Sequence, residues 1–368
     1  MKPNIIFVLL DGARWDRLEK NQKFVKLCQE GTLIKNVTTA LPYTFGAMNA
    51  IFTGLHGKEN GVDAYYKMFR LKENVEFLPE ILQKNGYFTA CNLISDKVIS
   101  KRGFDVYQSH DEYKDDLNQK HPILLEECFE NAGTKPVFCF FQFSRIHTVT
   151  VSETLKKYDW NDKEFYSKYQ DNLLEYDSVF DETCSYAQTI YEKLSSMRKL
   201  SNTIVIFFAD HGTGVGERFG ERNYGVYTYE ETIRTFYLFI GPKIIKNQIN
   251  NSLRSTLDIF PTILDLSDIH SAQSSGKILS DFLYGKTKID DCKYTFSETG
   301  GLQGPFPSPK EPNVFCVKTP SEKLIYFKAT EEWKYFILKD DPKEKNNLFE
   351  EEKCKELKNV LLDWINRP

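Results

Sequence analysis

Two short polar motifs each follow an apolar run of the length expected for a buried strand. Asp11 comes directly after the run Asn4–Leu10, and Asp210 and His211 come just after the run Thr203–Phe208. Continuous apolar runs are typical of parallel strands covered on both faces. Open α/β sheets bind ligands outside the carboxyl ends of such strands. The sequence therefore predicts that two carboxylates and an imidazole meet at one edge of a sheet.

Aspartate and histidine together form a ligand set for a divalent cation. The combination suits zinc or manganese, whereas calcium and magnesium prefer more oxygen donors. An ordinary alternative exists for each motif, because Asp-Gly after a strand is a common turn and an Asp-His pair is often the end of a loop. The metal hypothesis therefore depends on a third element elsewhere in the chain.

Residues 41–54 supply that third element. They are predicted to form a loop that enters a short helix at Thr44 and leaves it at Thr53 and Gly54. A hydroxyl at the start of a helix is well placed for chemistry on an anion, because the free amides and the helix dipole stabilise negative charge there. The alternative is an ordinary helix cap, a role that threonine often fills.

The composition indicates a folded globular protein that is not specialised for nucleic acid. Of 368 residues, 41% are hydrophobic and 14% aromatic, which argues against disorder. The net charge is -4 and no long stretch carries one sign, so no nucleic-acid footprint is suggested. The eight cysteines lack C-x-x-C spacing and are interpreted as reduced, buried small hydrophobes.

The order of apolar patterns predicts an α/β fold. Strand-like and helical patterns alternate, which favours a mostly parallel central sheet with helices on both faces. The strand-like runs are 4–10, 87–94, 136–144, 203–209 and 235–240, and the helical patterns are about 21–30, 75–85, 166–197 and 255–267. The carboxylates of the longest helix, Glu175, Asp177, Asp181 and Glu182, are expected to form its solvated face.

The texture changes near residue 290, which divides the chain into two predicted domains. Residues 1–290 would form the catalytic domain, and residues 291–368 a small antiparallel subdomain. Within the second part, residues 323–338 are predicted to form two strands around a turn near Ala329 and Thr330, and residues 350–365 a final helix. No apolar stretch has the length of a membrane span and no signal peptide is visible, so a cytoplasmic location is expected.

Seven motifs along the chain resemble those of the alkaline phosphatase and sulfatase superfamily, in the order in which that superfamily has them. Each motif is weak alone, but their order makes the resemblance specific. The motifs lie at residues 6–12, 52–62, 78–105, 209–212, 229–234, 258–265 and 340–348.

The resemblance implies a set of site residues. Asp11, Asp210 and His211 would hold one divalent ion, which is manganese, zinc, calcium or magnesium, and Thr44 would be both a further ligand and the nucleophile. His147 matches the position of a histidine that members of the superfamily present to the substrate, so it is expected to protonate the leaving group. A second metal set is not found, because the remaining histidines, His56, His110, His121 and His270, are poorly placed for one.

Several positions depart from the sulfatase pattern. Thr44 stands where sulfatases have the Cys or Ser that becomes formylglycine, and threonine cannot yield that aldehyde. Met48 stands where sulfatases carry an Arg, and Gly12 where they carry a second Asp. Tyr224 or Tyr227 is expected to line the pocket where relatives often keep a His or Lys.

These departures favour phosphoryl chemistry as the predicted function. The expectation is a metal-dependent hydrolase or phosphotransferase that acts on phosphodiesters or phosphonate esters through a phosphothreonine intermediate. The alternatives are an atypical sulfatase that works without formylglycine and a non-catalytic binding relative. The expected partner is a small-molecule, glycan or lipid ester and not nucleic acid, and the sequence is silent on the oligomeric state.

Overall fold

A nine-stranded mixed sheet forms the centre of the part of the chain that the computed structural model describes, residues 2–150, 159–271 and 273–367. The strands follow the order β4-β3-β5-β1-β6-β7-β2-β8, and β9 pairs with β2. Their bounds are β1 Asn4–Leu10, β2 Thr32–Thr38, β3 Phe88–Leu93, β4 Val106–Ser109, β5 Val137–Phe143, β6 Thr203–Phe208, β7 Arg234–Ile240, β8 Gln248–Asn250 and β9 Arg254–Ser255.

Strand β1 lies at the middle of the sheet, between β5 and β6, and is parallel to both. Leu9 pairs with Phe208 of β6, and Leu10 pairs with Phe143 of β5. The three strands therefore end at the same level, so the residues that follow them emerge side by side at one edge of the sheet. This register positions the motifs after β1 and β6 next to each other.

Strand β7 runs against this direction. It is antiparallel both to β6, where Tyr237 pairs with Phe208, and to β2, where Tyr237 pairs with Ile34. The chain therefore leaves β6 at the edge that carries the polar motifs and returns through β7 from that same edge. The intervening residues 209–233 are held over the ends of the strands.

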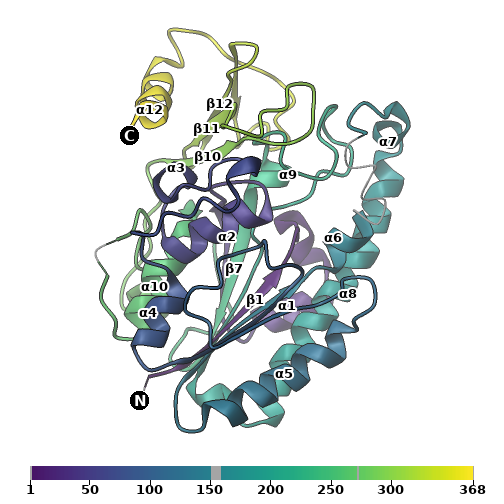
Figure 1. Cartoon of the computed structure of the whole chain (residues 1–368). Helices are drawn as coiled ribbons and strands as arrows, with labels where there is room; N and C mark the ends of the chain where they lie inside the picture. The colour runs from purple at the N-terminus through teal and green to yellow at the C-terminus, as the bar shows by residue number, and fades with distance from the viewer. Residues whose placement is uncertain (1, 151–158, 272, 368) are drawn as a thin grey trace.

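Helices cover both faces of the sheet, which confirms the predicted fold class (Figure 1). On one face, Ile6, Val8 and Leu10 of β1 pack in an apolar cluster with residues of α1 (Gln22–Cys28), α5 (Leu117–Ala132) and α8 (Tyr169–Ser196). On the other face, the alternate residues Ile5, Phe7 and Leu9 pack with α2 (Thr44–Thr53), α4 (Leu78–Lys84) and α10 (Ile259–Leu266).

The polar face of α8 is solvated, as expected: Glu175 and Glu182 are exposed, and Asp177 and Asp181 are half-buried. Its carboxylates also form ion pairs. Asp177 binds Arg17, Asp181 binds Lys23 and Glu182 binds Arg145, so three of the four carboxylates join the helix to other segments. Leu174 belongs to the predicted apolar stripe but is 68% exposed. Spacing along a helix indicates which residues share a face, but not where the neighbouring elements stop.

A second sheet, antiparallel and four-stranded, lies at the carboxyl end of the chain. Its strands are β10 Thr295–Thr299, β11 Val314–Lys318, β12 Glu322–Phe327 and β13 Glu332–Ile337, and α12 (Lys355–Asn366) packs on it through Leu357, Leu361 and Trp364. The predicted hairpin is confirmed as β12 and β13, and the predicted final helix begins at Lys355 instead of residue 350. The boundary at residue 290 stays a prediction.

Four longer elements were not expected: β2, α5, β10 and β11. In β2, Lys35 and Asn36 interrupt the apolar pattern at the point where the register shifts, and α5 contains Pro122, which normally disfavours a helix interior. The short elements are η1 Trp15–Lys20, α3 Gly57–Asn60, η2 Tyr65–Lys67, α6 Arg145–Thr150, α7 Lys163–Ser167, η4 Leu200–Asn202, α9 Glu230–Ile233, η5 Thr256–Asp258 and α11 Ser280–Leu283. Among the described residues, no helix combines the length and apolar character needed to span a bilayer.

Candidate metal centre

Three of the predicted ligands converge at the carboxyl ends of β1 and β6. One ligand atom of each of Asp11, Asp210 and His211 lies within 4.8 Å of the other two. His211 Nε2 lies 3.7 Å from Asp11 Oδ1 and 3.4 Å from Asp210 Oδ2. The register of the parallel pair causes this approach, because it ends both strands at the same level.

Thr44 reaches the same point from a different element. It is the first residue of α2, and its Oγ1 lies 3.4 and 3.5 Å from the two carboxylate oxygens of Asp11 and 3.3 Å from His211 Nε2. The structure thus brings all four predicted ligands together. Their roles as metal ligands, and that of Thr44 as a nucleophile, stay predictions.

The hydrogen bonds of His211 define its tautomer. Nδ1 lies 2.7 Å from the carbonyl oxygen of Gly212, which can only accept a hydrogen bond, so Nδ1 carries the proton. In the neutral imidazole Nε2 then carries the lone pair, and it faces Thr44 and the two carboxylates. A neutral imidazole in this state is the form that binds a metal ion.

The two carboxylates form a site of uncompensated negative charge. Asp11 is 1% exposed and Asp210 is fully buried. Burial, and for Asp11 also repulsion from Asp210, raises the pKa of each carboxyl group to about 6. Asp210 Oδ2 accepts no hydrogen bond, and in the described part of the chain no lysine or arginine forms an ion pair with either group. A divalent cation fits this donor set and would neutralise it.

Two neighbours orient the carboxylates, and one of them was missed by the sequence analysis. Gln142, in β5, donates a hydrogen bond of 2.7 Å from Nε2 to Asp11 Oδ2. The backbone amide of Gly12 donates to Asp210 Oδ1 at 3.4 Å. Gln142 stands in the apolar run 137–143, and a buried polar residue in such a run was the available signal.

Glycine at position 12 has a local reason. Its φ is +72°, and a Cβ there would lie 2.8 Å from Thr213 Oγ1 and 3.3 Å from Ile146 Cγ2. A second aspartate at this position would therefore be strained and crowded. Met48, which replaces an arginine of the sulfatase pattern, is fully buried and packs in the apolar cluster beneath the site.

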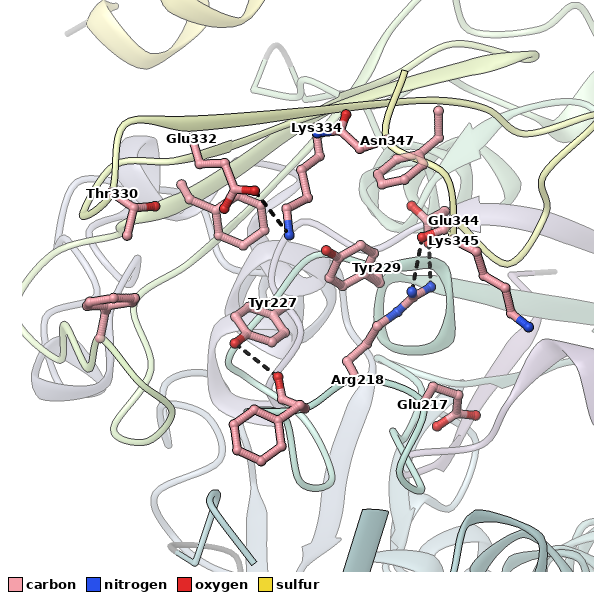
Figure 2. Close-up of a pocket in the computed structure, with 14 residues that line it drawn as sticks. Glu217, Arg218, Tyr227, Tyr229, Thr330, Glu332, Lys334, Glu344, Lys345 and Asn347 are labelled. Carbon is pink, nitrogen blue, oxygen red and sulfur yellow. Dashed lines mark hydrogen bonds and ion pairs between the residues drawn. The ribbon is translucent and has the colours of Figure 1, made fainter. Parts of the chain in front are cut away.

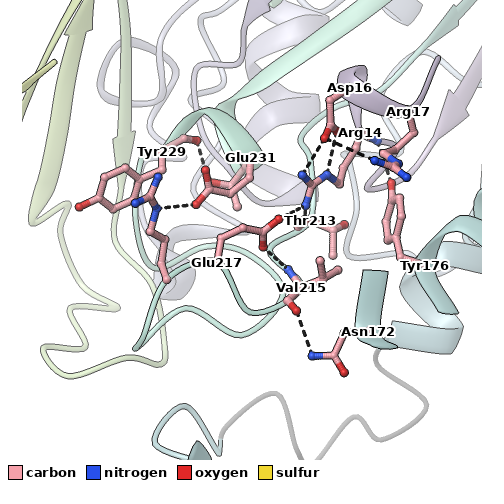
Figure 3. Close-up of polar contacts among 12 residues, drawn as sticks. Arg14, Asp16, Arg17, Asn172, Tyr176, Thr213, Val215, Glu217, Tyr229 and Glu231 are labelled. Atoms are coloured by element: carbon pink, nitrogen blue, oxygen red, sulfur yellow. Dashed lines mark hydrogen bonds and ion pairs between the residues drawn. The ribbon is translucent and has the colours of Figure 1, made fainter. Parts of the chain in front are cut away.

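A polar network from helix α8 supports the two loops that carry the ligands (Figure 3). Tyr176 donates to the carbonyl oxygen of Gly12 at 2.9 Å and accepts the amide of Arg14 at 2.8 Å. The Arg14 guanidinium binds the carbonyl of Thr213 and the carboxylate of Glu217, and Glu217 also accepts the amide of Val215. The loops after β1 and β6 are thus tied to each other.

Aromatic and polar side chains lie beside the ligands. The ring centroid of Tyr224 lies 4.3 Å from that of His211 and 6.3 Å from that of His147. His147 Nδ1 lies 3.2 Å from a carboxylate oxygen of Glu112, which orients the imidazole. Tyr224 therefore lies at the site, as expected. The role of His147 as a proton donor stays a prediction.

Tyr227 lies instead in a separate cavity of about 420 Å³ (Figure 2). This cavity is bordered by the loop around Arg218 and by the β12–β13 hairpin, and none of the four predicted ligands lines it. Within it, Arg218 stacks over Tyr229, and Tyr227 donates to the carbonyl of Phe219.

Three of the remaining histidines contact side chains away from the predicted ligands. His110 bonds Asn92 and Ser144, and His121 bonds Tyr186 and Asn92. His56 packs edge-on against Trp364. The absence of a second metal set stays a prediction.

Comparison with known proteins assigns the family. Residues 3–269 match the profile described as Sulfatase, and residues 221–367 match the profile described as N-sulphoglucosamine sulphohydrolase, C-terminal. The chain belongs to the sulfatase family. This confirms the resemblance to the alkaline phosphatase and sulfatase superfamily.

Named sulfatases resemble the sequence of this family member over part of its length. An arylsulfatase of Clostridium perfringens is 31% identical over 168 residues, 44% of this chain and 33% of that protein. An N-acetylglucosamine-6-O-sulfatase of Bacteroides thetaiotaomicron is 28% identical over 203 residues, 52% of this chain and 33% of that protein. The matched segments thus span about a third of the length of these relatives.

Solved structures share the fold of the whole sulfatase-like chain. A 2-O GAG sulfatase aligns with a TM-score of 0.82 at 19% identity, covering 100% of this chain and 92% of the other. A phosphonate monoester hydrolase from Silicibacter pomeroyi aligns with a TM-score of 0.79 at 14% identity, covering 99% and 94%. Proteins of this fold therefore include both a sulfatase and a phosphonate monoester hydrolase. Of the functions weighed from the sequence, the relatives favour the sulfatase alternative over hydrolysis of a phosphodiester or phosphonate ester.

Proposed function

We propose that this protein hydrolyses a sulfate ester with the Thr44 hydroxyl as nucleophile and with one divalent cation held by Asp11, Asp210, His211 and Thr44. The observation that supports this most directly is the approach of Thr44 Oγ1 to within 3.5 Å of both carboxylate oxygens of Asp11 and 3.3 Å of His211 Nε2. The family of the chain and the names of its relatives favour a sulfate ester as the substrate.

The residues divide the first half of the reaction between them. Thr44 Oγ1 attacks the sulfur atom, and its proton passes to the Asp11 carboxylate, whose two oxygens lie 3.4 and 3.5 Å from it. The bond between sulfur and the ester oxygen breaks, and that oxygen takes a proton from His147. The products are an alcohol and a sulfate monoester of Thr44. A bound divalent cation would neutralise charge on the sulfuryl oxygens and lower the pKa of the threonine hydroxyl.

Water completes the second half. Its oxygen attacks the sulfur of the threonine ester, the bond to Thr44 Oγ1 breaks, and that oxygen regains a proton from Asp11. His147 takes one proton from the attacking water, which restores its starting state, and hydrogen sulfate leaves. The position of Thr44 at the first turn of α2 assists both halves, because the helix dipole stabilises the anion there.

A second candidate is hydrolysis of a phosphodiester or phosphonate ester, or transfer of its phosphoryl group, through a phosphothreonine. Two observations favour it. Position 44 is a threonine, which cannot be converted to formylglycine, and a phosphonate monoester hydrolase shares the fold. The third candidate, a binding protein without catalysis, is opposed by the assembly of all four predicted ligands at one point.

A substrate panel separates these candidates. Aryl sulfates, phosphate monoesters, phosphodiesters and phosphonates are each assayed with manganese, zinc, calcium or magnesium. We expect aryl sulfate turnover that falls by about 10³-fold or more in Thr44→Ala and is largely kept in Thr44→Ser. A sulfated or phosphorylated Thr44 peptide found by mass spectrometry identifies the covalent step. If Thr44→Ala is as active as the parent, Thr44 is not the nucleophile. If no ester is turned over, the third candidate, a binding protein without catalysis, is the one that remains.

A further inference from the structure

A basic groove lies beside the turn whose Tyr65 ring packs against Phe45, the residue after Thr44. It has a volume of about 700 Å³ and is bordered by the side chains of five cationic residues and one carboxylate. The cations are Lys58, Lys67, Arg70, Lys72 and Lys310, and the carboxylate is Asp63. This local excess of positive charge contrasts with the net charge of -4 for the chain.

The turn η2 connects the groove with the start of helix α2, where Thr44 lies. The ring of Tyr65 lies 4.8 Å from that of Phe45, the residue after Thr44, and 5.0 Å from that of Tyr43. The next residues, Tyr66 and Lys67, border the groove. One short turn therefore presents an aromatic ring to the nucleophile helix and a ring and a cation to the groove.

Two distant segments are tied together to form its walls. The amide of Tyr65 donates to the carbonyl of Gly300, and the amide of Tyr66 donates to the carbonyl of Pro309 at 2.8 Å. These bonds hold the loop that carries Lys310 beside the turn that carries Lys67 and Arg70. The walls of the groove are thus built into the fold.

The five cations differ in the hydrogen bonds and ion pairs that their side chains make. Lys67 pairs with Asp63 at 2.7 Å, and Lys72 donates to the carbonyl oxygens of Lys58 and Glu59. Lys58 donates to the carbonyl of Trp364 and lies over its ring. Arg70 and Lys310 are exposed and make no side-chain hydrogen bond or ion pair within the described residues, so they have charge left for a ligand.

We propose that this groove binds an anionic glycan chain, sulfated or rich in uronate, and aligns its ester with Thr44. As a statement about the substrate this rests on the proposed function. Cations on both walls match charges repeated along such a chain, and the ring of Tyr66, 62% exposed, offers a face for a sugar ring. The position of the groove beside a turn that packs on the start of α2 favours a substrate chain over an unrelated polyanion.

The experiment measures binding and does not need turnover. Arg70→Gln, Lys72→Gln and Lys310→Gln are combined in one variant. A size-defined heparin oligosaccharide is titrated by calorimetry at several salt concentrations. We expect the affinity to fall by about 10-fold or more. The slope of log K against log salt concentration should also become shallower, by the release of up to about three fewer counterions. The matched control combines Lys84→Gln, Lys135→Gln and Arg198→Gln, three exposed cations outside the groove, and should bind as the parent does.

Two results would overturn the proposal. One is an equal loss in the groove variant and in the control. The other is binding of a thymidine oligonucleotide of matched charge that is as tight as that of heparin and equally sensitive to the groove substitutions, which would indicate a general polyanion surface.

The same titration in Asp210→Asn separates this proposal from the proposed function, because that variant alters the cation site and leaves the groove intact. If no ester is turned over but the groove variant still loses heparin, only the proposed function fails. If aryl sulfates are hydrolysed and the groove variant binds heparin like the parent, only the groove fails.

Discussion

The phenol oxygen of Tyr176 lies 2.9 Å from the carbonyl oxygen of Gly12 and donates a hydrogen bond to it. Tyr176 is in the first third of α8, far along the chain from Gly12, and it also accepts the amide of Arg14. Helix α8, the longest among the described residues, therefore holds the turn that follows Asp11 through two hydrogen bonds. Because Asp11 directly precedes Gly12, this contact helps to set the position of a predicted metal ligand.

Tyr176→Phe tests that role. The substitution removes both hydrogen bonds and leaves the amide of Arg14 without its partner, so we expect a loss of about 1–3 kcal/mol in the free energy of unfolding. We also expect weaker binding of the divalent cation by calorimetry. Tyr186→Phe is the matched control, since it removes a buried hydrogen bond from the same helix to His121, away from the ligands. A similar loss of cation affinity in both variants would contradict a specific role for Tyr176.

Gly12→Ala tests the backbone requirement at the turn. The left-handed conformation costs a non-glycine residue about 1–2 kcal/mol, and the added Cβ also meets Thr213 Oγ1. We expect a total loss of at least about 2 kcal/mol in urea unfolding. Gly86→Ala is the control, because φ there is +89° and no atom lies within 4 Å of the added Cβ. Equal losses at the two positions would show that the contact with Thr213 does not matter.

Asp210→Asn should change stability in opposite directions with and without metal. Without metal, it removes one of two buried and adjacent carboxylates, so we expect the free energy of unfolding at neutral pH to rise on the order of 1 kcal/mol. With metal, the stabilisation by a saturating divalent cation, about 2.7 kcal/mol at a hundred times Kd, should be lost. Asp177→Asn, which alters a pair with Arg17, should keep that stabilisation. If the metal stabilises Asp210→Asn as it does the parent, Asp210 is not a ligand.

Glu221 gives a pH dependence that is independent of the metal ligands. Burial raises the pKa of its carboxyl group to about 8, and its Oε1 accepts the amides of Val226 and Tyr227 in the loop that carries Tyr224. A carboxyl group whose pKa is raised by folding adds stability that is complete below the unfolded value of 4.5 and is lost as the pH rises through about 8.

We therefore expect the free energy of unfolding to fall by up to about 1.4 kcal/mol per pH unit between these values, and Glu221→Gln to remove that slope. Urea unfolding of parent and variant across this range checks it. Parallel pH profiles of the two proteins would exclude Glu221 as the cause.

His147→Ala tests the predicted proton donor. An alkyl sulfate needs protonation of its leaving oxygen, so we expect its kcat to fall by about 10²–10⁴-fold. A nitrophenyl sulfate leaves without such help, and its kcat should change little. His270→Ala, an exposed histidine, should affect neither substrate. An equal decrease for both leaving groups would assign His147 to binding instead of proton transfer.

The convergence of Asp11 with Asp210 and His211 could be predicted from the sequence, because each follows a continuous apolar run and parallel strands end at one edge of a sheet. The end of the helix Thr44–Thr53 could be predicted as well, since glycine favours the left-handed position that Gly54 holds; at its start the N-cap is Tyr43 and not Thr44. These features depend on local patterns and on one general rule of sheet architecture.

The remaining features of the site depend on which segments become neighbours. Gln142 contacts Asp11 because β5 pairs with β1, and Tyr176 reaches Gly12 because α8 packs across the sheet. Tyr224 packs against His211 because the loop before the reversed strand β7 folds back over the strand ends. Periodicity indicates which face of a helix or strand is apolar, but it does not indicate which element packs against that face. Pairing and packing between residues far apart in the chain decide it, and so only the tertiary structure shows how the ligands are held.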